Sequence, residues 1–342
     1  MSKRIPLLLF FPVLLLSPGS LFCQQGTSPI PATVAAPAQE STPNEAPPAH
    51  KASVEHWDKL ALRDNSLVAD EPLMGEVDKL PHFTRELMRV QWRSGDPIDL
   101  YIIRPVGVAK PPVILYLYGY PDEENRFFNN YLCSLVTRNG FAAVGFSSIL
   151  TGQRYHDVPM KEWFVSDLQQ SLGGTTHDVQ MILNYLEKRG DFDMSRVGMF
   201  GEGSGGTIAL LAASVDPRIK AVDVLDPWGD WPVWLATSPI VPNKERAEYL
   251  KPGFLNPLAP FDPINILPHF NAVPLRVQQT LFDQTTTPAA VRQKIAEVVP
   301  KTADFITYKD QEEYLDKAGR DGRMLTWMFA HLPPAETKSS IQ

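Results

Sequence analysis

The sequence predicts an α/β protein built on a doubly wound, mainly parallel sheet. Strand and helix patterns alternate from about residue 87 to residue 332, and such alternation is typical of parallel strands with helices on both faces. Residues 112–119 (PVILYLYG) form a continuous apolar run, as expected for a strand that is buried on both faces. With 342 residues, 44% hydrophobic and 21% charged, the chain has enough apolar material for one large domain or two ordinary ones.

The expected elements follow one another in a regular order. Residues 87–92 and 98–105 flank Ser94-Gly95-Asp96-Pro97, a hairpin signature that places an antiparallel edge before the parallel strands. A helix that ends at Asn139-Gly140 follows the strand at 112–119. The later strands are expected at 141–148, 196–201, 220–226, 274–283 and 304–309, and the later helices near 175–189, 205–215, 289–298 and 315–332.

Residues 227–273 interrupt this alternation. The segment holds Trp228, Trp231, Trp234 and many prolines, which indicates an irregular, lid-like insertion. The tryptophans either pack the core of this insertion or line a pocket, since they follow a strand that ends at the carboxyl edge of the sheet. The second alternative would favour an aromatic or sugar-like ligand.

The N-terminal residues 1–23 have the pattern of a signal peptide. Lys3 and Arg4 precede an apolar run at 5–16, which is too short to span a bilayer comfortably. We therefore expect export to the periplasm, the cell envelope or the medium, with no stable membrane span. Cys23 leaves lipidation open, although Phe22 stands where a small residue is expected. Cleavage would leave Cys133 alone, so no intramolecular disulfide is expected.

The remaining chain divides into three parts. Residues 24–55 are a Pro/Ala-rich spacer that cannot bury enough surface to fold, residues 56–333 form the expected domain, and residues 334–342 are a polar tail. The formal charge of −7 and the lack of any basic block argue against nucleic acid or an anionic membrane as the partner. A small-molecule ligand is the expected partner, and no pattern specifies an oligomeric state.

The glycine-rich turn at 201–206 joins the strand at 196–201 directly to the helix at 205–215. The segment 196–226 (RVGMFGEGSGGTIALLAASVDPRIKAVDVLD) resembles the nucleophile elbow of α/β-hydrolases, in which Gly-x-Ser-x-Gly lifts a serine above the sheet. The overlapping segment 191–206 (DFDMSRVGMFGEGSGG) is similar to the dienelactone-hydrolase and prolyl-oligopeptidase-like esterases. The resemblance implies an α/β-hydrolase fold and carboxylic-ester hydrolysis, with no cofactor and no metal.

The register of this motif places glycine where the family has its nucleophile. Gly201 matches the leading glycine and Gly205-Gly206 match the paired glycines, so the nucleophile position falls on Gly203. Ser204 then stands where the family contributes a backbone N–H to the oxyanion hole. A frame centred on Ser204 would put Glu202 in place of the leading glycine, which the turn tolerates poorly.

The other positions of the family's site can be assigned in the same way. Tyr118-Gly119 ends the strand at 112–119, and Tyr120 supplies the second oxyanion N–H. The acid position falls on Asp283, with Gln284 as a rival. The loop after 304–309 lacks a histidine, and Glu313 is nearest to the base position. His331, the one histidine further downstream, lies in the terminal helix pattern.

Serine catalysis needs a hydroxyl, a base and a carboxylate. Because the first two are missing, we predict that the triad is degenerate and that the protein binds a ligand with a carbonyl or carboxylate group. The expected pocket lies between Tyr118–Pro121, Ser204, Asp283 and the insertion, with Trp228 among its lining residues. Residual or non-standard ester hydrolysis is the alternative.

Three further interpretations compete with this one. Gly201-x-Gly203-x-x-Gly206, followed by Asp226 at the end of the next strand, also fits a dinucleotide-binding turn. Asp283 and Glu313 could share a proton or hold a divalent cation if they face each other. His156, in the loop after 141–148, could substitute for the absent base, whereas His177 is expected to be structural.

Overall fold

The computed structural model describes residues 69, 71–92, 96–120, 125–151, 164–271, 273–283 and 285–332. The expected signal peptide, spacer and tail, together with Cys23, Pro121, His156 and Gln284, lie outside these residues. None of the described helices is long and apolar enough to cross a membrane.

The described strands form one nine-stranded sheet with the order β1-β2-β3-β5-β4-β6-β7-β8-β9. Strands β4 through β9 are mutually parallel, and β1, β2 and β3 add an antiparallel edge. The predicted fold class is therefore confirmed. The strands are β1 (Leu73–Lys79), β2 (Phe83–Val90), β3 (Ile98–Pro105), β4 (Pro112–Leu117), β5 (Ala142–Phe146), β6 (Asp193–Glu202), β7 (Ile219–Leu225), β8 (Leu275–Thr280) and β9 (Asp304–Tyr308).

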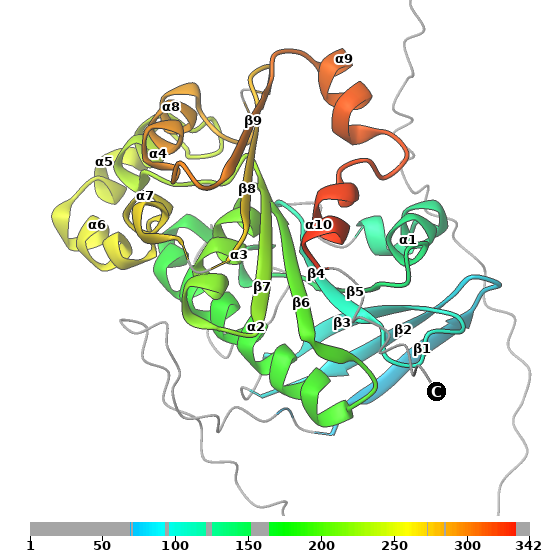
Figure 1. Ribbon diagram of the computed structural model, residues 1–342. Coiled ribbons are helices and arrows are strands. Elements are labelled where there is room, and N and C mark those ends of the chain that lie inside the picture. The colour runs from blue at the N-terminus through cyan, green and yellow to red at the C-terminus, as the bar shows by residue number, and fades with distance from the viewer. Residues whose placement is uncertain are drawn as a thin grey trace, which may run out of the picture. The chain divides into compact units, whose positions relative to one another are not determined.

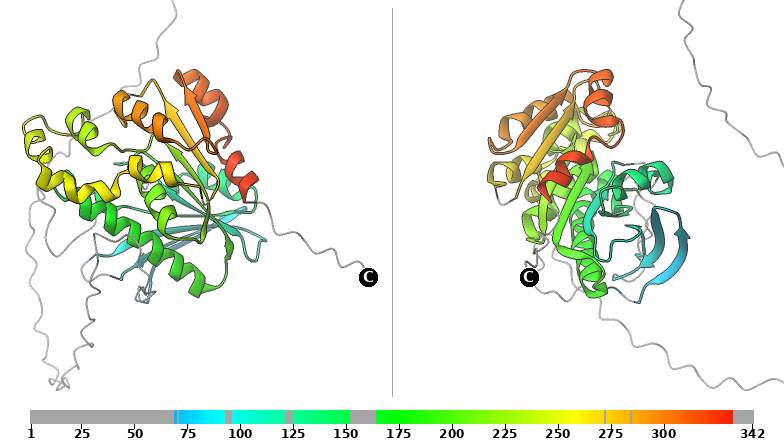
Figure 2. Two further views of the ribbon diagram at one scale, coloured as in Figure 1. Left: turned by 60° about the vertical axis from the view of Figure 1, so that its left-hand side comes forward. Right: turned by 45° about the vertical axis from the view of Figure 1, so that its right-hand side comes forward.

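Helices cover both faces of this sheet (Figure 1). One buried apolar cluster joins α2 (Leu168–Arg189), α3 (Ser204–Val215), α8 (Ala289–Val298) and the insertion to one face. A second cluster joins α1 (Asn130–Thr137) and α10 (Leu325–His331) to the other face. Figure 2 shows the same two layers from other directions.

The strand order reverses beside β4, and this reversal determines where a site can form. The chain passes from β4 through α1 to β5 on one side, and then returns through α2 to β6 on the other side of β4. The loops that follow β4 and β6 therefore diverge to opposite faces. In open α/β sheets ligands bind in the crevice at such a switch point, at the carboxyl ends of the strands.

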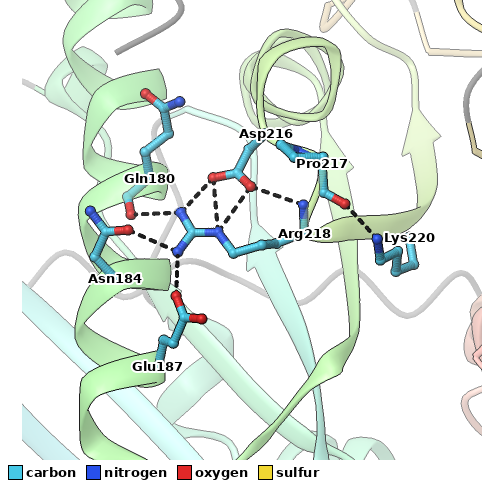
Figure 3. A network of polar contacts seen from close by, with 7 residues as sticks. All are labelled: Gln180, Asn184, Glu187, Asp216, Pro217, Arg218 and Lys220. Atoms are coloured by element: carbon cyan, nitrogen blue, oxygen red, sulfur yellow. Dashed lines mark hydrogen bonds and ion pairs between the residues drawn. The ribbon is translucent and has the colours of Figure 1, made fainter. Parts of the chain in front are cut away.

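An arginine after α3 ties the helix of the glycine turn to its neighbour α2 (Figure 3). The Arg218 guanidinium donates to Asp216 (2.6 Å), to the Asn184 side chain (2.8 Å) and to the Gln180 carbonyl (3.4 Å). It also lies 3.2 Å from the Glu187 carboxylate. These contacts join the C-terminal end of α3 to α2.

Three regions differ from the sequence-based expectation. Strand β1 was not predicted, because its side chains are almost all exposed and show no alternation. The expected helix at 315–332 is replaced by a π-helical turn at 315–319, which directly follows α9 (Gln311–Tyr314), and by α10. The two are separated where Asp321 and Gly322 adopt positive φ angles of 56° and 72°. The helix expected near 175–189 begins earlier, at Leu168.

The insertion is more regular than expected. It folds into the short helices α4 (Trp231–Thr237), α5 (Arg246–Tyr249), α6 (Pro252–Leu258) and α7 (Pro263–Ile266). The Asp262 carboxylate accepts hydrogen bonds from the backbone N–H groups of Asp230 (2.8 Å) and Trp231 (3.0 Å). The Arg246 guanidinium binds the carbonyls of Ala236, Ser238 and Val241. Side chains thus satisfy the helix ends that a proline-rich segment leaves open.

Candidate functional site

The turn after β6 has the strained backbone of a sharp strand-to-helix connection. Gly203 adopts φ 54° and ψ −119°, and α3 begins at the next residue, Ser204. The flanking glycines are required by space, since a Cβ at Gly201 would lie 2.3 Å from the Gly205 carbonyl oxygen and a Cβ at Gly205 would lie 2.0 Å from that of Leu117. Gly203 therefore stands at the apex of the turn.

The Ser204 hydroxyl binds a backbone N–H group that was expected to bind a ligand. Its Oγ accepts a hydrogen bond of 2.9 Å from the backbone N–H of Tyr120, in the loop after β4. The Ser204 side chain is fully buried. We expected the N–H groups of Tyr120 and Ser204 to face a ligand; the structure differs, because the Tyr120 N–H is already bonded within the chain.

The loop after β8 engages the carboxylate of Asp283. Its Oδ1 accepts from the N–H and the hydroxyl of Thr285 (both 2.7 Å), and its Oδ2 accepts from the Thr286 hydroxyl (2.6 Å). Partial burial alone would raise the pKa of Asp283, but the bonds from Thr286 and Thr285 outweigh it and lower the pKa. The methyl carbon of Thr286 lies 3.0 Å from the point where a Cβ on Gly203 would stand. Thr286 thus separates Asp283 from the apex of the turn.

The side chains of Glu313 and its neighbour Tyr314 contact different groups. The Glu313 carboxylate accepts from the Lys309 N–H (2.9 Å) and pairs with Lys317 (2.6 Å), and these contacts lower its pKa. Tyr314 instead packs against the rings of Tyr308 and Phe282. Its pKa is raised to about 12 by burial and, secondly, by the charge of Glu202. The charge of Glu202 therefore acts on Tyr314, whereas the polar contacts of Glu313 are with Lys309 and Lys317.

These contacts also bear on the idea that Asp283 and Glu313 share a proton. Two carboxylates in one site raise the pKa of one of them, whereas here the pKa of both groups is lowered by separate partners. Among the described residues, no group of three His, Cys, Asp or Glu side chains is placed to hold a metal ion.

Sequence comparisons with known proteins give little information on this chain. No protein-family model matches the sequence. An uncharacterized 31.7 kDa protein from the traX-finO intergenic region of Escherichia coli is 26% identical over 122 residues, which cover 34% of this chain and only 38% of that protein.

Solved structures of esterases are similar over most of the chain. Acetyl xylan esterase from Paenibacillus sp. R4 has a TM-score of 0.56 at 17% identity, covering 81% of this chain and 93% of that one. Acetyl xylan esterase 1 from Thermoanaerobacterium sp. JW/SL YS485 has a TM-score of 0.57 at 18% identity, covering 79% and 93%. Acylaminoacyl peptidase from Pyrococcus horikoshii has a TM-score of 0.56 at 18% identity, covering 75% of this chain but 43% of that one. This chain has the α/β-hydrolase fold.

Within this hydrolase fold, a charged and aromatic cluster borders the glycine turn. Arg126, in a short helical turn before α1, pairs with the Glu202 carboxylate at 2.8 Å and lies over the Tyr118 ring at 4.4 Å. Burial raises the pKa of Tyr118, so its phenol stays protonated at neutral pH. A Cβ on Gly119 would lie 3.1 Å from the Glu202 carbonyl oxygen, so the loop after β4 passes directly over the end of β6. We call Tyr118, Arg126, Glu202 and Tyr314 the Arg126 cluster.

Sequence reasoning identified only Tyr118 in this cluster. Glu202 lay inside the glycine motif, and its charge within an otherwise uncharged turn was a signal that could have been used. Arg126 and Tyr314 gave no such signal, because their roles depend on how a loop and a short helix are oriented.

The three tryptophans of the insertion pack the core. All are at most 1% exposed, with ring centroids 4.7 Å apart for Trp228 and Trp234 and 5.8 Å apart for Trp231 and Trp234. Only Trp228 adjoins the turn, since its Nε1 lies 3.5 Å from the Cβ position of Gly203. Of the two alternatives, the structure therefore shows that the tryptophans pack the core of the insertion. Trp228 also covers one side of the apex at Gly203.

The Asp226 carboxylate is buried and bonds to other residues of the chain. It ends β7 with φ 46° and is 3% exposed, and its carboxylate accepts from the N–H and the hydroxyl of Thr280. Burial raises its pKa to about 6 against these bonds. In a dinucleotide site the corresponding acid binds a ribose hydroxyl, whereas this carboxylate is covered and already bonded.

No histidine among the described residues bonds to Ser204 or Asp283. His177 is buried in the middle of α2, which agrees with its expected structural role. His331 contacts the Trp327 carbonyl and ring on α10.

Proposed function

We propose that this α/β-hydrolase-fold protein does not cleave esters through a serine in its glycine turn, and that it is exported and binds a small ligand with a carbonyl or carboxylate group. The observation that carries the proposal is the 2.9 Å bond from the Tyr120 N–H to the Ser204 hydroxyl, beside Gly203, which has no side chain. This bond occupies one of the two donors that would stabilise a tetrahedral intermediate.

The Arg126 cluster supports the ligand chemistry. Arg126 has 41% of its side-chain surface exposed although it pairs with Glu202, and a guanidinium binds carboxylate oxygens well. The Tyr314 hydroxyl is protonated at neutral pH, because its pKa lies well above 7, so the phenol can donate to a ligand oxygen. Both groups favour an oxygen acceptor on the ligand.

The test of lost serine chemistry uses the mature chain and a fluorophosphonate probe. We expect no covalent adduct and no burst of product from acetyl esters. Two of the similar structures are acetyl xylan esterases, so acetylated xylo-oligosaccharides belong among the esters tested. Stoichiometric labelling of Ser204, absent from Ser204→Ala, would overturn the proposal in favour of residual ester hydrolysis.

The test of binding is calorimetry with acetate, acetylated xylo-oligosaccharides and their deacetylated forms. Arg126→Gln should weaken binding of the responding ligand about fivefold or more, because a charged donor is lost. Arg89→Gln is the matched control, since Arg89 also pairs with a carboxylate, that of Asp99, at 2.9 Å. Saturable binding of NAD or NADP, abolished by Gly206→Val, would instead support the dinucleotide interpretation.

Export is tested separately. The full-length chain expressed with its N-terminus should yield a shortened product outside the cytoplasm, with a new N-terminus between about residue 20 and residue 24 in mass spectrometry. Retention of Met1–Arg4 in the product would contradict it.

A further inference from the structure

A groove lies at the end of the parallel strands that is opposite to the glycine turn. Its lining comes from the turn between β1 and β2, the end of β3 and the last turn of α1. Ile103 of β3 pairs with Ala143 at the start of β5, so this groove stands at the amino ends of the parallel strands. The Arg126 cluster stands at their carboxyl ends, and none of its four residues lines the groove.

Backbone hydrogen bonds hold the walls of this groove in place. The Val106 N–H donates to the His82 carbonyl (3.0 Å) and joins two of the turns, and the Gly140 N–H donates to the Thr137 carbonyl (2.9 Å). The volume is about 510 Å³, which lies within the range of small-molecule sites. The lining residues, all within the described part of the chain, are Pro81, His82, Pro105, Val106, Val108, Ser134, Thr137, Arg138 and Gly140.

The lining combines apolar walls with an uncompensated positive charge. Val106 is 56% exposed and Val108 is 36% exposed, so solvent reaches apolar side chains on one wall. Arg138, on the other wall, donates to the Asp321 carbonyl at 3.1 Å, a neutral group that orients the guanidinium and leaves its charge unpaired. Among the described residues no carboxylate lies within ion-pair distance of Arg138, and no acidic residue lines the groove.

The other polar groups of the lining do not supply competing donors. The Ser134 hydroxyl donates to the Asn130 carbonyl and the Thr137 hydroxyl donates to the Cys133 carbonyl, both at 2.8 Å. The groove is therefore complementary to a negative headgroup on an apolar body.

We propose that this groove binds an amphipathic monoanion, a carboxylate with an alkyl or aryl tail. Arg138 binds the carboxylate oxygens, and Val106 and Val108 contact the tail. The site is separate from the one proposed at the Arg126 cluster and does not depend on it.

The test is calorimetric titration of the full mature chain with octanoate. We expect saturable binding that is weakened about fivefold or more by Arg138→Gln because a charge-assisted hydrogen bond is lost. Val108→Asp should abolish it, because a carboxylate then faces the ligand's own. Lys301→Gln removes the same charge from an exposed position outside the groove and should leave binding unchanged. Octylamine, with the same tail and the opposite charge, should not bind.

The outcomes separate the two proposed sites. Octanoate binding lost in Arg126→Gln but kept in Arg138→Gln would overturn the groove proposal and move the ligand to the Arg126 cluster. Equal binding of octylamine, or no binding of octanoate by the wild-type chain at millimolar concentration, would also overturn it. Circular dichroism of each variant confirms that the fold is kept.

Discussion

The Ser204 hydroxyl oxygen lies 2.9 Å from the Tyr120 backbone nitrogen and joins the first turn of α3 to the loop after β4. The contact crosses the crevice at which the strand order reverses, and one of its ends is fully buried. The Tyr120 N–H, which we propose corresponds to an oxyanion-hole donor, is satisfied here by the protein itself. The hydrogen bond therefore stabilises the contact between the first turn of α3 and the loop after β4.

Ser204→Ala should destabilise the protein by about 1–3 kcal/mol, because the partly buried Tyr120 N–H loses its acceptor. Urea denaturation measures the free energy of unfolding. Ser214→Ala, in the same helix, is the matched control, since the Ser214 hydroxyl only donates to the Leu211 carbonyl on a less buried surface. Equal stability of the two variants would mean that water satisfies the Tyr120 N–H.

Gly203→Ser alone should not create an efficient esterase. No histidine among the described residues bonds to Ser204 or Asp283, so we expect the new hydroxyl to lack a base, and an oxyanion hole by itself gives only residual catalysis. A burst of product in a stopped-flow assay with an activated ester would contradict this expectation. Gly203→Ala is the control, because it adds the same Cβ without a hydroxyl.

Gly203→Ala should itself cost about 1–3 kcal/mol, because φ 54° strains any residue with a Cβ. Part of this cost comes from the Thr286 methyl carbon, 3.0 Å from the added atom. Thr286→Ser removes that methyl and keeps the hydroxyl that bonds to Asp283. A double-mutant cycle should then show a favourable coupling of about 0.5–1 kcal/mol between the two substitutions. Strict additivity would mean that Thr286 does not crowd the apex.

Asp226→Asn should change how stability depends on pH. The pKa of Asp226 is raised to about 6 by burial, above the unfolded value of about 3.9, so the folded chain holds this proton more tightly. The Asp226 contribution to stability is therefore largest below about pH 4 and falls as the pH rises to about 6. Asparagine stays neutral throughout. The stability of wild type relative to Asp226→Asn should thus fall by about 1–3 kcal/mol between pH 4 and pH 7; a pH-independent difference would contradict the raised pKa.

Much of the fold was predictable because buried strands leave a strong pattern. The run at 112–119 and the hairpin around 94–97 correspond to β4 and to the β2–β3 pair. Strand β1 gave no signal, since an exposed edge strand needs no apolar face. The break before α10 depends on Asp321 in a left-handed conformation, and a single Asp-Gly pair within a helical pattern is a weak signal for such a break.

The candidate site was predictable only at positions where neighbouring backbone atoms leave no room for a Cβ atom. The glycines at 201 and 205 fix the turn because any Cβ would overlap backbone atoms, so the position of Gly203 followed from their spacing. The side-chain contacts did not follow in this way. Glu313 and Tyr314 are neighbours in one short helix, and only the orientation of that helix decides which of them interacts with Glu202. The partnership of Ser204 with Tyr120 joins residues 84 positions apart, and no local pattern encodes it.

The stacked tryptophans of the insertion have an optical consequence. Trp228 and Trp234 lie 4.7 Å apart with their planes inclined by 33°, close enough for their electronic transitions to couple and to give paired bands of opposite sign in circular dichroism. Because the Trp228 Nε1 also lies 3.5 Å from the Cβ position of Gly203, that signal would respond when a ligand or a substitution shifts the apex of the turn. The chain thus contains an intrinsic chromophore pair that can report on its candidate site without any label.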